Sequence, residues 1–298
     1  MALKPFISII VPTYHDWDRL SLCIQALDEQ TYPKQRYEVI VVNNDPDDNM
    51  PLGYYLPANM TIVSEGKPGS YAARNQGISL AKGVIYGFTD SDCIPHPEWI
   101  EEAAKVFEAG NVDRIAGKIE FIFKNDEKQT WIELYESIYE FNQKKAVKDH
   151  KASVTANLFV RKEVFEKVGL FDLSKMSGED FGWNRRATAK SFNIVYADKV
   201  TISHPARSTF SEFRKKKRRE FGGKKSYKIT GVMSVVKHFL FLPFYFYLVV
   251  VKKNLQLFSV EKRLSVSEIA KVFLLNLYLY LINSIEYFRL MFKGEKLR

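Results

Sequence analysis

The chain has 298 residues, of which 46% are hydrophobic and 27% charged, and its net charge is +9. This composition is typical of a globular protein with a sizeable core and excludes a disordered chain. Only two cysteines occur, without the spacing of a metal knuckle or a disulfide framework. The first residues lead directly into an apolar strand and do not resemble a secretion signal. We therefore expect a protein of a reducing compartment, the cytoplasm.

Six elements are predicted before residue 90: strands at 6–11, 37–42, 61–63 and 83–89, and helices at 18–30 and within 69–81. The second half of the chain predicts strands at 119–123, 155–160 and 194–202, and helices from about 130, at 162–168 and at 178–190. Strands that alternate with helices in this way are typical of an α/β fold with a mostly parallel sheet flanked by helices.

Positive charge is concentrated near the end of this region. Between Arg207 and Lys228 the chain carries ten Lys or Arg against two Glu, a surplus of eight charges out of nine. The remainder is close to neutral, which argues against a nucleic-acid-binding protein. Two uncharged runs follow, at 239–251 and 272–285, and each is shorter than the roughly 17–25 apolar residues of a spanning helix.

Polar side chains follow three of the predicted strands. Thr13 follows the first strand, Asn43–Asp45 the second, and Asp90-Ser91-Asp92 the fourth. In an open parallel sheet, ligands bind at the carboxyl ends of the strands. Two carboxylates that lie two residues apart can bind one divalent cation and leave coordination positions for phosphate oxygens. The sequence therefore predicts a metal and diphosphate site at this edge of the sheet.

Six stretches together carry a more specific signal: Ser8–Tyr14, Val41–Asp45, Gly69–Ile78, Phe88–Cys93, Gly178–Asp180 and His204–Arg207. In this order they resemble the motifs of family 2 glycosyltransferases of the GT-A fold, over roughly the first 210 residues. The resemblance implies an inverting enzyme that takes a sugar from a UDP- or GDP-sugar, and it implies roles for the residues that match.

Seven of these residues are implied to bind the nucleotide sugar: Pro12, Thr13, Tyr14, Asn44, Arg74, Asp90 and Ser91. Asn44 would meet the nucleobase where the family often has Asp, so the identity of the base stays open. Arg74 would lie near the diphosphate or the aspartates. The alternative for Arg74 is an arginine on a helix face, paired with an exposed acid.

The resemblance also implies the metal site and the catalytic base. Asp92 would be the principal ligand of Mn²⁺ or Mg²⁺, with Asp90 toward the ribose or the metal. His204 would be a third ligand, or else a hydrogen-bonded surface histidine. Asp180 would be the general base. The alternative for Asp180 is a carboxylate that stabilises the start of a helix.

Three residues match the acceptor side: Glu179, Trp183 and Asn157. For Trp183, packing in the core is the alternative to stacking on a sugar. The acceptor is expected to be a hydroxyl of a glycan or glycolipid in cell-surface polysaccharide synthesis. A polyprenyl phosphate acceptor is the alternative within the same fold, and a membrane-tethered binding or scaffold protein is the non-enzyme alternative.

We expect a GT-A catalytic domain at 1–210, with a nucleotide-sugar half at about 1–115 and an acceptor half at about 116–210. A basic linker at 211–230 and a hydrophobic helical region at 231–298 would follow. The basic run either closes over the donor diphosphate or binds anionic lipid. Its position before two apolar segments favours peripheral or monotopic attachment at the inner face of the cell membrane. The alternatives are a membrane-inserted hairpin and a segment packed on the catalytic domain.

Overall fold

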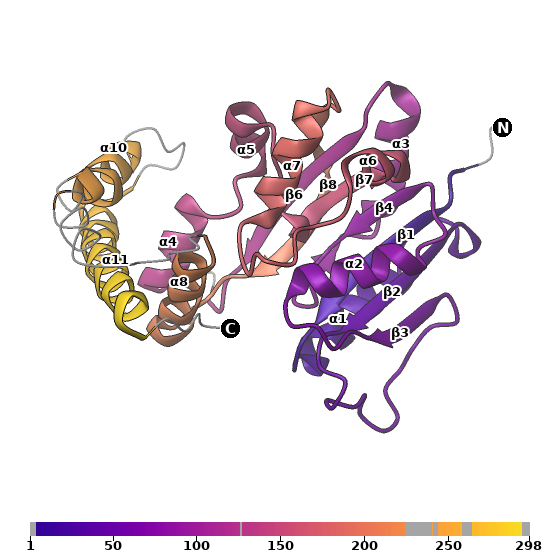
Figure 1. The fold of residues 1–298 in the computed structure, drawn as a ribbon, viewed down its shortest axis with the longest axis horizontal. Helices are drawn as coiled ribbons and strands as arrows, with labels where there is room; N and C mark the ends of the chain where they lie inside the picture. Colours follow the sequence, from indigo (N-terminus) through magenta and orange to yellow (C-terminus); the bar gives the residue numbers. More distant parts are fainter. Residues whose placement is uncertain (1–3, 126, 225–239, 241–243, 258–263, 294–298) are drawn as a thin grey trace. The chain divides into compact units, whose positions relative to one another are not determined.

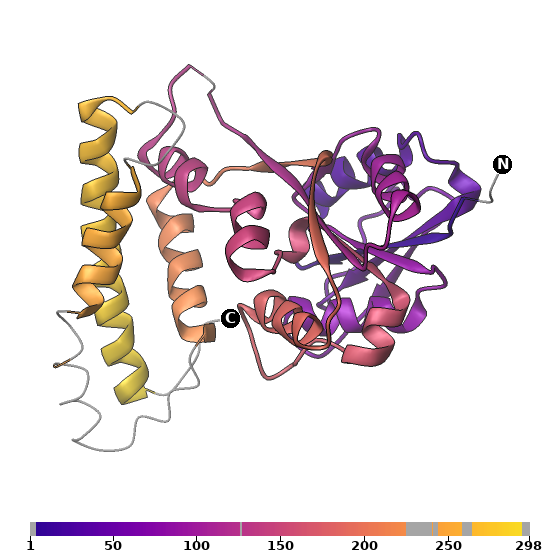
Figure 2. The same cartoon turned by 90° about the horizontal axis from the view of Figure 1, so that it is seen from above.

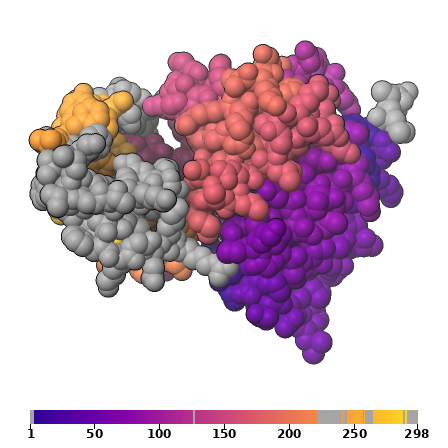
Figure 3. All heavy atoms as spheres, in the orientation of Figure 1, coloured from indigo at the N-terminus to yellow at the C-terminus, as the bar shows by residue number. Residues whose placement is uncertain are grey.

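The computed structural model describes residues 4–125, 127–224, 240, 244–257 and 264–293. The chain divides into two compact units. Unit 1 consists of Met1–Ile122 and Phe141–Pro205, and unit 2 consists of Phe123–Glu140 and Ala206–Arg298. On the face shown in Figure 3, the atoms of the first segment of unit 1 lie directly against those of its second segment.

The described part of unit 1 is built on an eight-stranded sheet in the order β3-β2-β1-β4-β7-β6-β8-β5 (Figures 1 and 2). Its strands are β1 (Ile7–Thr13), β2 (Tyr37–Asn43), β3 (Met60–Ser64), β4 (Ile85–Phe88), β5 (Ile94–Pro95), β6 (Arg114–Ile122), β7 (Leu158–Arg161) and β8 (Ile194–Pro205). Only β5 and β7 run antiparallel to their neighbours in this sheet. The predicted mostly parallel α/β sheet is confirmed.

Helices cover both faces of this sheet. Ile7, Ile9 and Val11 of β1 pack with α1 (Trp17–Asp28) and α3 (Trp99–Ala109). Ile10 faces the other way, because side chains alternate along a strand, and it packs with α2, α6 and α7. The bounds of these helices and of two neighbouring short elements are α2 (Ser70–Leu80), α5 (Gln143–His150), η2 (Thr155–Asn157), α6 (Lys162–Val168) and α7 (Glu179–Ala189).

A glycine brings α2 close to the central strand. A Cβ atom at Gly77 would lie 2.5 Å from Cγ2 of Ile10, closer than two carbon atoms can approach. The absent side chain therefore allows α2 to pack tightly on β1, with its first turns at the carboxyl edge of the sheet.

The described part of unit 2 is helical. It contains α4 (Trp131–Tyr139), α8 (Phe210–Lys224), a π-helical segment η3 (Tyr247–Lys252), α10 (Lys253–Gln256) and α11 (Val266–Lys293). Its core joins apolar side chains from these helices: Ile132, Leu134, Tyr135, Phe213, Leu257, Val272, Leu275 and Leu279. The helices of the predicted C-terminal extension therefore share one core with α4.

The structure divides the chain differently from the predicted domains. Residues 123–140, which we assigned to the acceptor half, pack in unit 2. Residues 210–224 form α8, where the sequence predicted a basic linker. The helix forms because Phe213 is buried against the aromatic ring of Tyr135. Residues 225–239, which the predicted linker and hydrophobic region include, lie outside the described residues.

Part of the basic run on α8 points into unit 2. Lys216 and Lys217 are both buried, and Lys216 Nζ donates to Glu136 Oε1 and Glu140 Oε2 at 3.2 Å each. Burial alone would raise the pKa of Glu140, but Lys217 and Lys216 outweigh it and hold the pKa well below its ordinary value. These lysines therefore join α8 to α4, and they do not face solvent.

The same run also contacts α11. Arg218 Nε donates to Glu286 Oε2 at 2.7 Å, and Glu286 is buried. Of the six basic residues at 214–219, Arg214, Lys215 and Arg219 are exposed. Half of these six side chains are therefore available to a lipid surface.

Replacing Glu136 with Met should destabilise unit 2, because buried Lys216 loses a carboxylate partner. We expect a loss of about 3–5 kcal/mol in the free energy of unfolding, as found when one partner of a buried ion pair is removed. The double variant Glu136→Met/Lys216→Met should regain part of this loss, because Arg207, which also donates to Glu136, still lacks its partner. Thermal and urea unfolding measure both, with Lys215→Met on the exposed side of α8 as the control. A double variant less stable than the single one would contradict the pairing.

Candidate active site

The polar ends of β1 and β2 meet at the carboxyl edge of the sheet. The backbone N–H of Asn44 donates to the carbonyl of Thr13 at 2.9 Å. The side-chain Nδ2 of Asn44 donates to the carbonyls of Glu65 and Lys67, at 3.0 and 2.7 Å. Its Oδ1 accepts the N–H of Gly69 at 2.6 Å, directly before α2. Asn44 thus fixes the loop to α2, and both of its amide hydrogens are engaged in doing so.

The three residues predicted to line the base and ribose pocket differ in exposure. Pro12 and Thr13 are buried at the end of β1. Tyr14 is 47% exposed, and its ring stands edge-on to His15 with 4.3 Å between the centroids. His15 Nε2 in turn lies 2.9 Å from Asp45 Oδ2. Of the three, Tyr14 alone presents a side chain at the surface.

Arg74 joins α2 to the first aspartate of the predicted metal site. Its guanidinium donates to Asp90 Oδ1, and the arginine is buried. Arg74 Nε, Thr13 Oγ1 and Thr89 Oγ1 are buried, and the described residues offer them no hydrogen-bond partner. A buried polar group left in this state costs about 1–3 kcal/mol. These atoms, all at one edge of the sheet, fit a site that a polar ligand completes.

Asp92 lies beside His204. Asp92 Oδ2 is 3.6 Å from His204 Nε2, and one ligand atom from each of Asp92, Cys93 and His204 lies within 4.8 Å of the others. His204 is the last residue but one of β8 and is buried between the rings of Phe121 and Phe141. Burial and the nearby carboxylates raise the pKa of the Cys93 thiol. The carboxylate of Asp92 and the imidazole of His204 fit a borderline divalent cation such as Mn²⁺.

The sequence did not identify the residues on α1 that surround this pair. Arg19 Nη1 lies 3.7 Å from Asp92 Oδ2, and Arg19 Nε donates to Asp16 Oδ1 at 2.7 Å. Ser91 Oγ donates to Asp16 Oδ2 at 3.1 Å. Ser91 thus holds the start of α1. No sequence motif identifies Arg19. It is recognisable only as a residue in the first turn of the helix that follows the first strand.

Asp180 lies in the first turn of α7, after Gly178 in the left-handed conformation with φ 79°. Its Oδ1 accepts the backbone N–H of Phe181 at 2.9 Å and lies 3.5 Å from the hydroxyl of Tyr71. The side chain is half-buried. Tyr71 belongs to α2 and lies within a matched motif, but the sequence assigned it no role.

The three residues predicted on the acceptor side are buried parts of the framework. Trp183 is 0% exposed and stacks on Phe165, with 4.3 Å between the ring centroids. Asn157 is 0% exposed and donates to two backbone carbonyls. Glu179 is buried and pairs with Arg186 at 2.6 Å. Of the two alternatives for Trp183, this burial fits packing in the core, because a residue that stacks on a sugar needs an exposed ring face.

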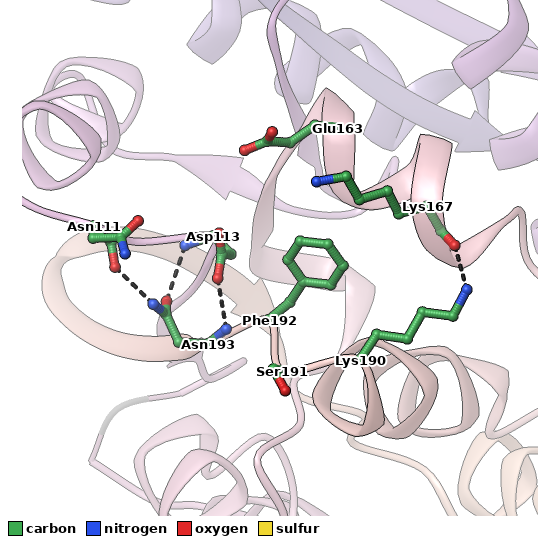
Figure 4. Close-up of a pocket in the computed structure, with 8 residues that line it drawn as sticks. All are labelled: Asn111, Asp113, Glu163, Lys167, Lys190, Ser191, Phe192 and Asn193. Carbon is green, nitrogen blue, oxygen red and sulfur yellow. Dashed lines mark hydrogen bonds between the residues drawn. The ribbon is translucent and has the colours of Figure 1, made fainter.

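An open pocket of about 700 Å³ lies at the opposite edge of the sheet (Figure 4). Its lining comes from α6 and from the segments that precede β6 and β8: Asn111, Asp113, Glu163, Lys167, Lys190, Ser191, Phe192 and Asn193. Two of the lining residues, Asn193 and Asp113, are hydrogen-bonded to each other. Because it lies where parallel strands begin, it is separate from the edge that carries Asp90 and Asp92.

Comparison with known proteins identifies the family. The sequence profile described as glycosyl transferase family 2 matches residues 8–169, more than half of the chain. Glycosyltransferase AglE of Haloferax volcanii is 38% identical over 217 residues, which cover 71% of this chain and 70% of the relative. A dolichyl N-acetyl-α-D-glucosaminyl phosphate 3-β-D-2,3-diacetamido-2,3-dideoxy-β-D-glucuronosyltransferase of Methanococcus voltae is 23% identical over 225 residues, 70% of each chain.

Two solved structures share the fold. The mannosyltransferase PcManGT of Pyrobaculum calidifontis, in complex with GDP-Man and Mn²⁺, aligns with a TM-score of 0.58 and 14% identity over 99% of this chain and 77% of its own. GalNAc-T7 with UDP, GalNAc and Mn²⁺ aligns with a TM-score of 0.53 and 14% identity over 70% of this chain and 45% of its own. The chain therefore belongs to glycosyl transferase family 2, with a GT-A fold, and is a glycosyltransferase.

Proposed function

We propose that the chain is a metal-dependent, inverting glycosyltransferase that moves a hexose-type sugar from a UDP- or GDP-sugar to a hydroxyl of a glycan or lipid-linked acceptor. We place it in cell-surface polysaccharide synthesis at the inner face of the cell membrane. One observation carries the catalytic part of the proposal. At one edge of the sheet, the Asp92–His204 pair accompanies the Arg74–Asp90 pair, and α2 links the latter to the half-buried carboxylate of Asp180.

The donor side requires groups that hold a diphosphate. Asp92 and His204 would hold Mn²⁺ or Mg²⁺, which as a Lewis acid offsets the charge on the departing nucleoside diphosphate. Arg74 keeps an N–H that the described residues leave without a partner, and a guanidinium is well suited to bind phosphate oxygens. The exposed ring of Tyr14 is suited to pack on the nucleoside.

The acceptor side requires a base. Asp180 would accept the proton of the acceptor hydroxyl while that oxygen forms its bond to the anomeric carbon. The bond from that carbon to the phosphate oxygen breaks, and its electron pair leaves with the nucleoside diphosphate. A single displacement from the opposite face inverts the anomeric configuration.

A screen of UDP- and GDP-sugars tests this proposal, with the product's anomeric configuration read by proton NMR. We expect one donor to be used only when Mn²⁺ or Mg²⁺ is present, with an inverted product. A product with retained configuration, or full activity in EDTA, would contradict the proposal.

A polyprenyl phosphate acceptor is the second candidate. A cavity of about 450 Å³ in unit 2 is lined by the aromatic side chains of Trp131 and Phe210 and by Lys128 and Lys271. Its described lining contains no acidic residue, which suits an anionic amphiphile. A phosphate nucleophile is already ionised near pH 7, so transfer to it hardly needs a base. Full activity of Asp180→Asn with a prenyl phosphate would favour this candidate.

The membrane part of the proposal is supported by α11. Within the described residues, the segment Val266–Glu286 is long and apolar enough to cross a membrane, judged by length and composition only. The uncharged run at 272–285 was too short for this, but the helix extends beyond it at both ends. The inward face of the helix packs in the core of unit 2, while its outward face exposes Leu274, Leu281 and Ile285. A helix that is apolar on both faces suits contact with lipid on its outer side.

Replacing Leu274 and Leu281 together with Glu should release the protein from anionic phospholipid vesicles, as measured by co-sedimentation. Attachment of the unchanged protein should persist in about 1 M salt, where the Debye length is about 3 Å, because half of the basic run is engaged inside unit 2. Lys215→Glu on the exposed side of α8 is the control and should bind nearly as well. Unchanged protein that stays in the soluble fraction at low salt would contradict the attachment.

A further inference from the structure

We propose that Tyr71 is a positioning residue for transfer: its hydroxyl holds the start of α7 and directs the carboxylate of Asp180 toward the acceptor. This inference rests on the proposed role of Asp180 as the base. It adds a residue of α2, the helix that also carries Arg74, to the acceptor side of the reaction.

The hydroxyl of Tyr71 makes three contacts with the start of α7. Its oxygen accepts the backbone N–H of Glu179 at 3.0 Å and that of Asp180 at 3.3 Å. Two accepted hydrogen bonds occupy both lone pairs of a hydroxyl oxygen. Its single hydrogen is then left for Asp180 Oδ1, which lies 3.5 Å away. Tyr71 therefore binds the backbone and the side chain of the proposed base at once.

The ring of Tyr71 is itself fixed. It is buried, and its centroid lies 5.6 Å from that of Phe171 and 5.8 Å from the guanidinium carbon of Arg74. The neighbouring Asn75 holds the loop before α7 through two hydrogen bonds with the backbone of Phe171, at 2.9 and 3.1 Å. Two consecutive turns of α2 thus hold Asp90 through Arg74 and Asp180 through Tyr71.

Removal of the hydroxyl should move the base. Burial, followed by the charge of Asp180, raises the pKa of Tyr71, so the group remains a neutral donor at the pH of an assay. In Tyr71→Phe, the N–H groups of Glu179 and Asp180 lose their acceptor. The Asp180 carboxylate is a replacement on the same helix start, where it already accepts the N–H of Phe181. We expect it to turn onto its own helix start and away from the acceptor hydroxyl.

Tyr71→Phe should therefore lower kcat by about 10- to 100-fold, a part of the 10²–10⁴-fold that a general base contributes. The affinity for nucleoside diphosphate with Mn²⁺, measured by calorimetry, should stay within about twofold of the unchanged protein, since no donor ligand is removed. Rates are expressed per binding site counted in the same titration, so partial unfolding does not imitate the effect.

Tyr86→Phe is the matched control. Tyr86 is buried in the same apolar cluster as Tyr71, and none of its described contacts is a hydrogen bond from its hydroxyl to the start of α7. Tyr86→Phe removes one hydroxyl oxygen from the same cluster, as Tyr71→Phe does, but breaks no described hydrogen bond to α7. We expect transfer by this variant to equal that of the unchanged protein.

A double-mutant cycle decides whether Tyr71 acts through Asp180. In an Asp180→Asn background, or in Asp180→Glu if the first is too slow to measure, Tyr71→Phe should cause no further loss. Equal losses in both backgrounds, or a donor affinity that falls as much as kcat, would overturn the inference. So would an inactive Asp180→Asn variant beside a fully active Tyr71→Phe variant. An Asp180→Asn variant that transfers to hydroxyls at full rate would instead remove the proposed base.

Discussion

Replacing Asp92 with Ala is expected to abolish both sugar transfer and metal-dependent binding of nucleoside diphosphate. Asp92 is the carboxylate beside His204, and an imidazole alone is a weak site for Mn²⁺ or Mg²⁺. The loss of a bound cation removes several kcal/mol of charge stabilisation, so we expect transfer to fall by about 10³-fold or more.

The measurement is a transfer assay with the preferred donor, beside calorimetry of nucleoside diphosphate in Mn²⁺. Asp149→Ala is the control, because Asp149 is an exposed carboxylate on α5. Metal-dependent binding that survives in Asp92→Ala would place the cation elsewhere.

Replacing Asp180 with Asn is expected to abolish transfer to a hydroxyl while leaving metal-dependent donor binding intact. The amide keeps the shape of the carboxylate and can still accept the N–H of Phe181, but it cannot take a proton. The expected fall in kcat is about 10²–10⁴-fold, the usual contribution of a general base.

Asp172→Asn is the matched control, since Asp172 is an exposed carboxylate in the loop before α7. The two variants should bind donor alike and differ only in transfer. An Asp180→Asn variant with the activity of the control would exclude Asp180 as the base for a hydroxyl acceptor.

The fold of unit 1 was predictable from the sequence because its signals are local. An apolar run such as 6–11 identifies a buried strand, and residues that end parallel strands must meet at one edge of the sheet. That rule alone brought Thr13, Asn44 and Asp90 to the same edge, where the structure has them.

The side-chain contacts that the sequence did not predict are made with residues that are distant in the sequence. The family resemblance placed Trp183 on the acceptor side with core packing as the alternative, and nothing near it in the chain shows that Phe165 stacks on its ring. The basic run that contains Lys216 was expected to contact the donor diphosphate or anionic lipid, but Glu136, 80 residues earlier, binds Lys216 inside unit 2. Tyr71 lies beside Asp180 in the structure but 109 residues before it in the sequence, and no spacing rule connects the two.

Asn44 shows that a motif can identify a position without giving the contact that its side chain makes. Its place in the motif was identified, but its chemistry was assigned to a nucleobase. In the structure its amide group binds Glu65, Lys67 and Gly69, so it shapes the loop before α2. A motif position can therefore be right while the contact made by its side chain is with the protein's own backbone.

Calorimetric titration of UDP and GDP into the unchanged protein, in Mn²⁺ and in EDTA, tests the central claim most directly. The Asp92–His204 site predicts that one of the two binds in Mn²⁺, and that binding is lost in EDTA and in Asp92→Ala. Equal affinity in Mn²⁺ and EDTA, or no binding of either nucleotide, would contradict a metal-dependent donor site at this edge of the sheet.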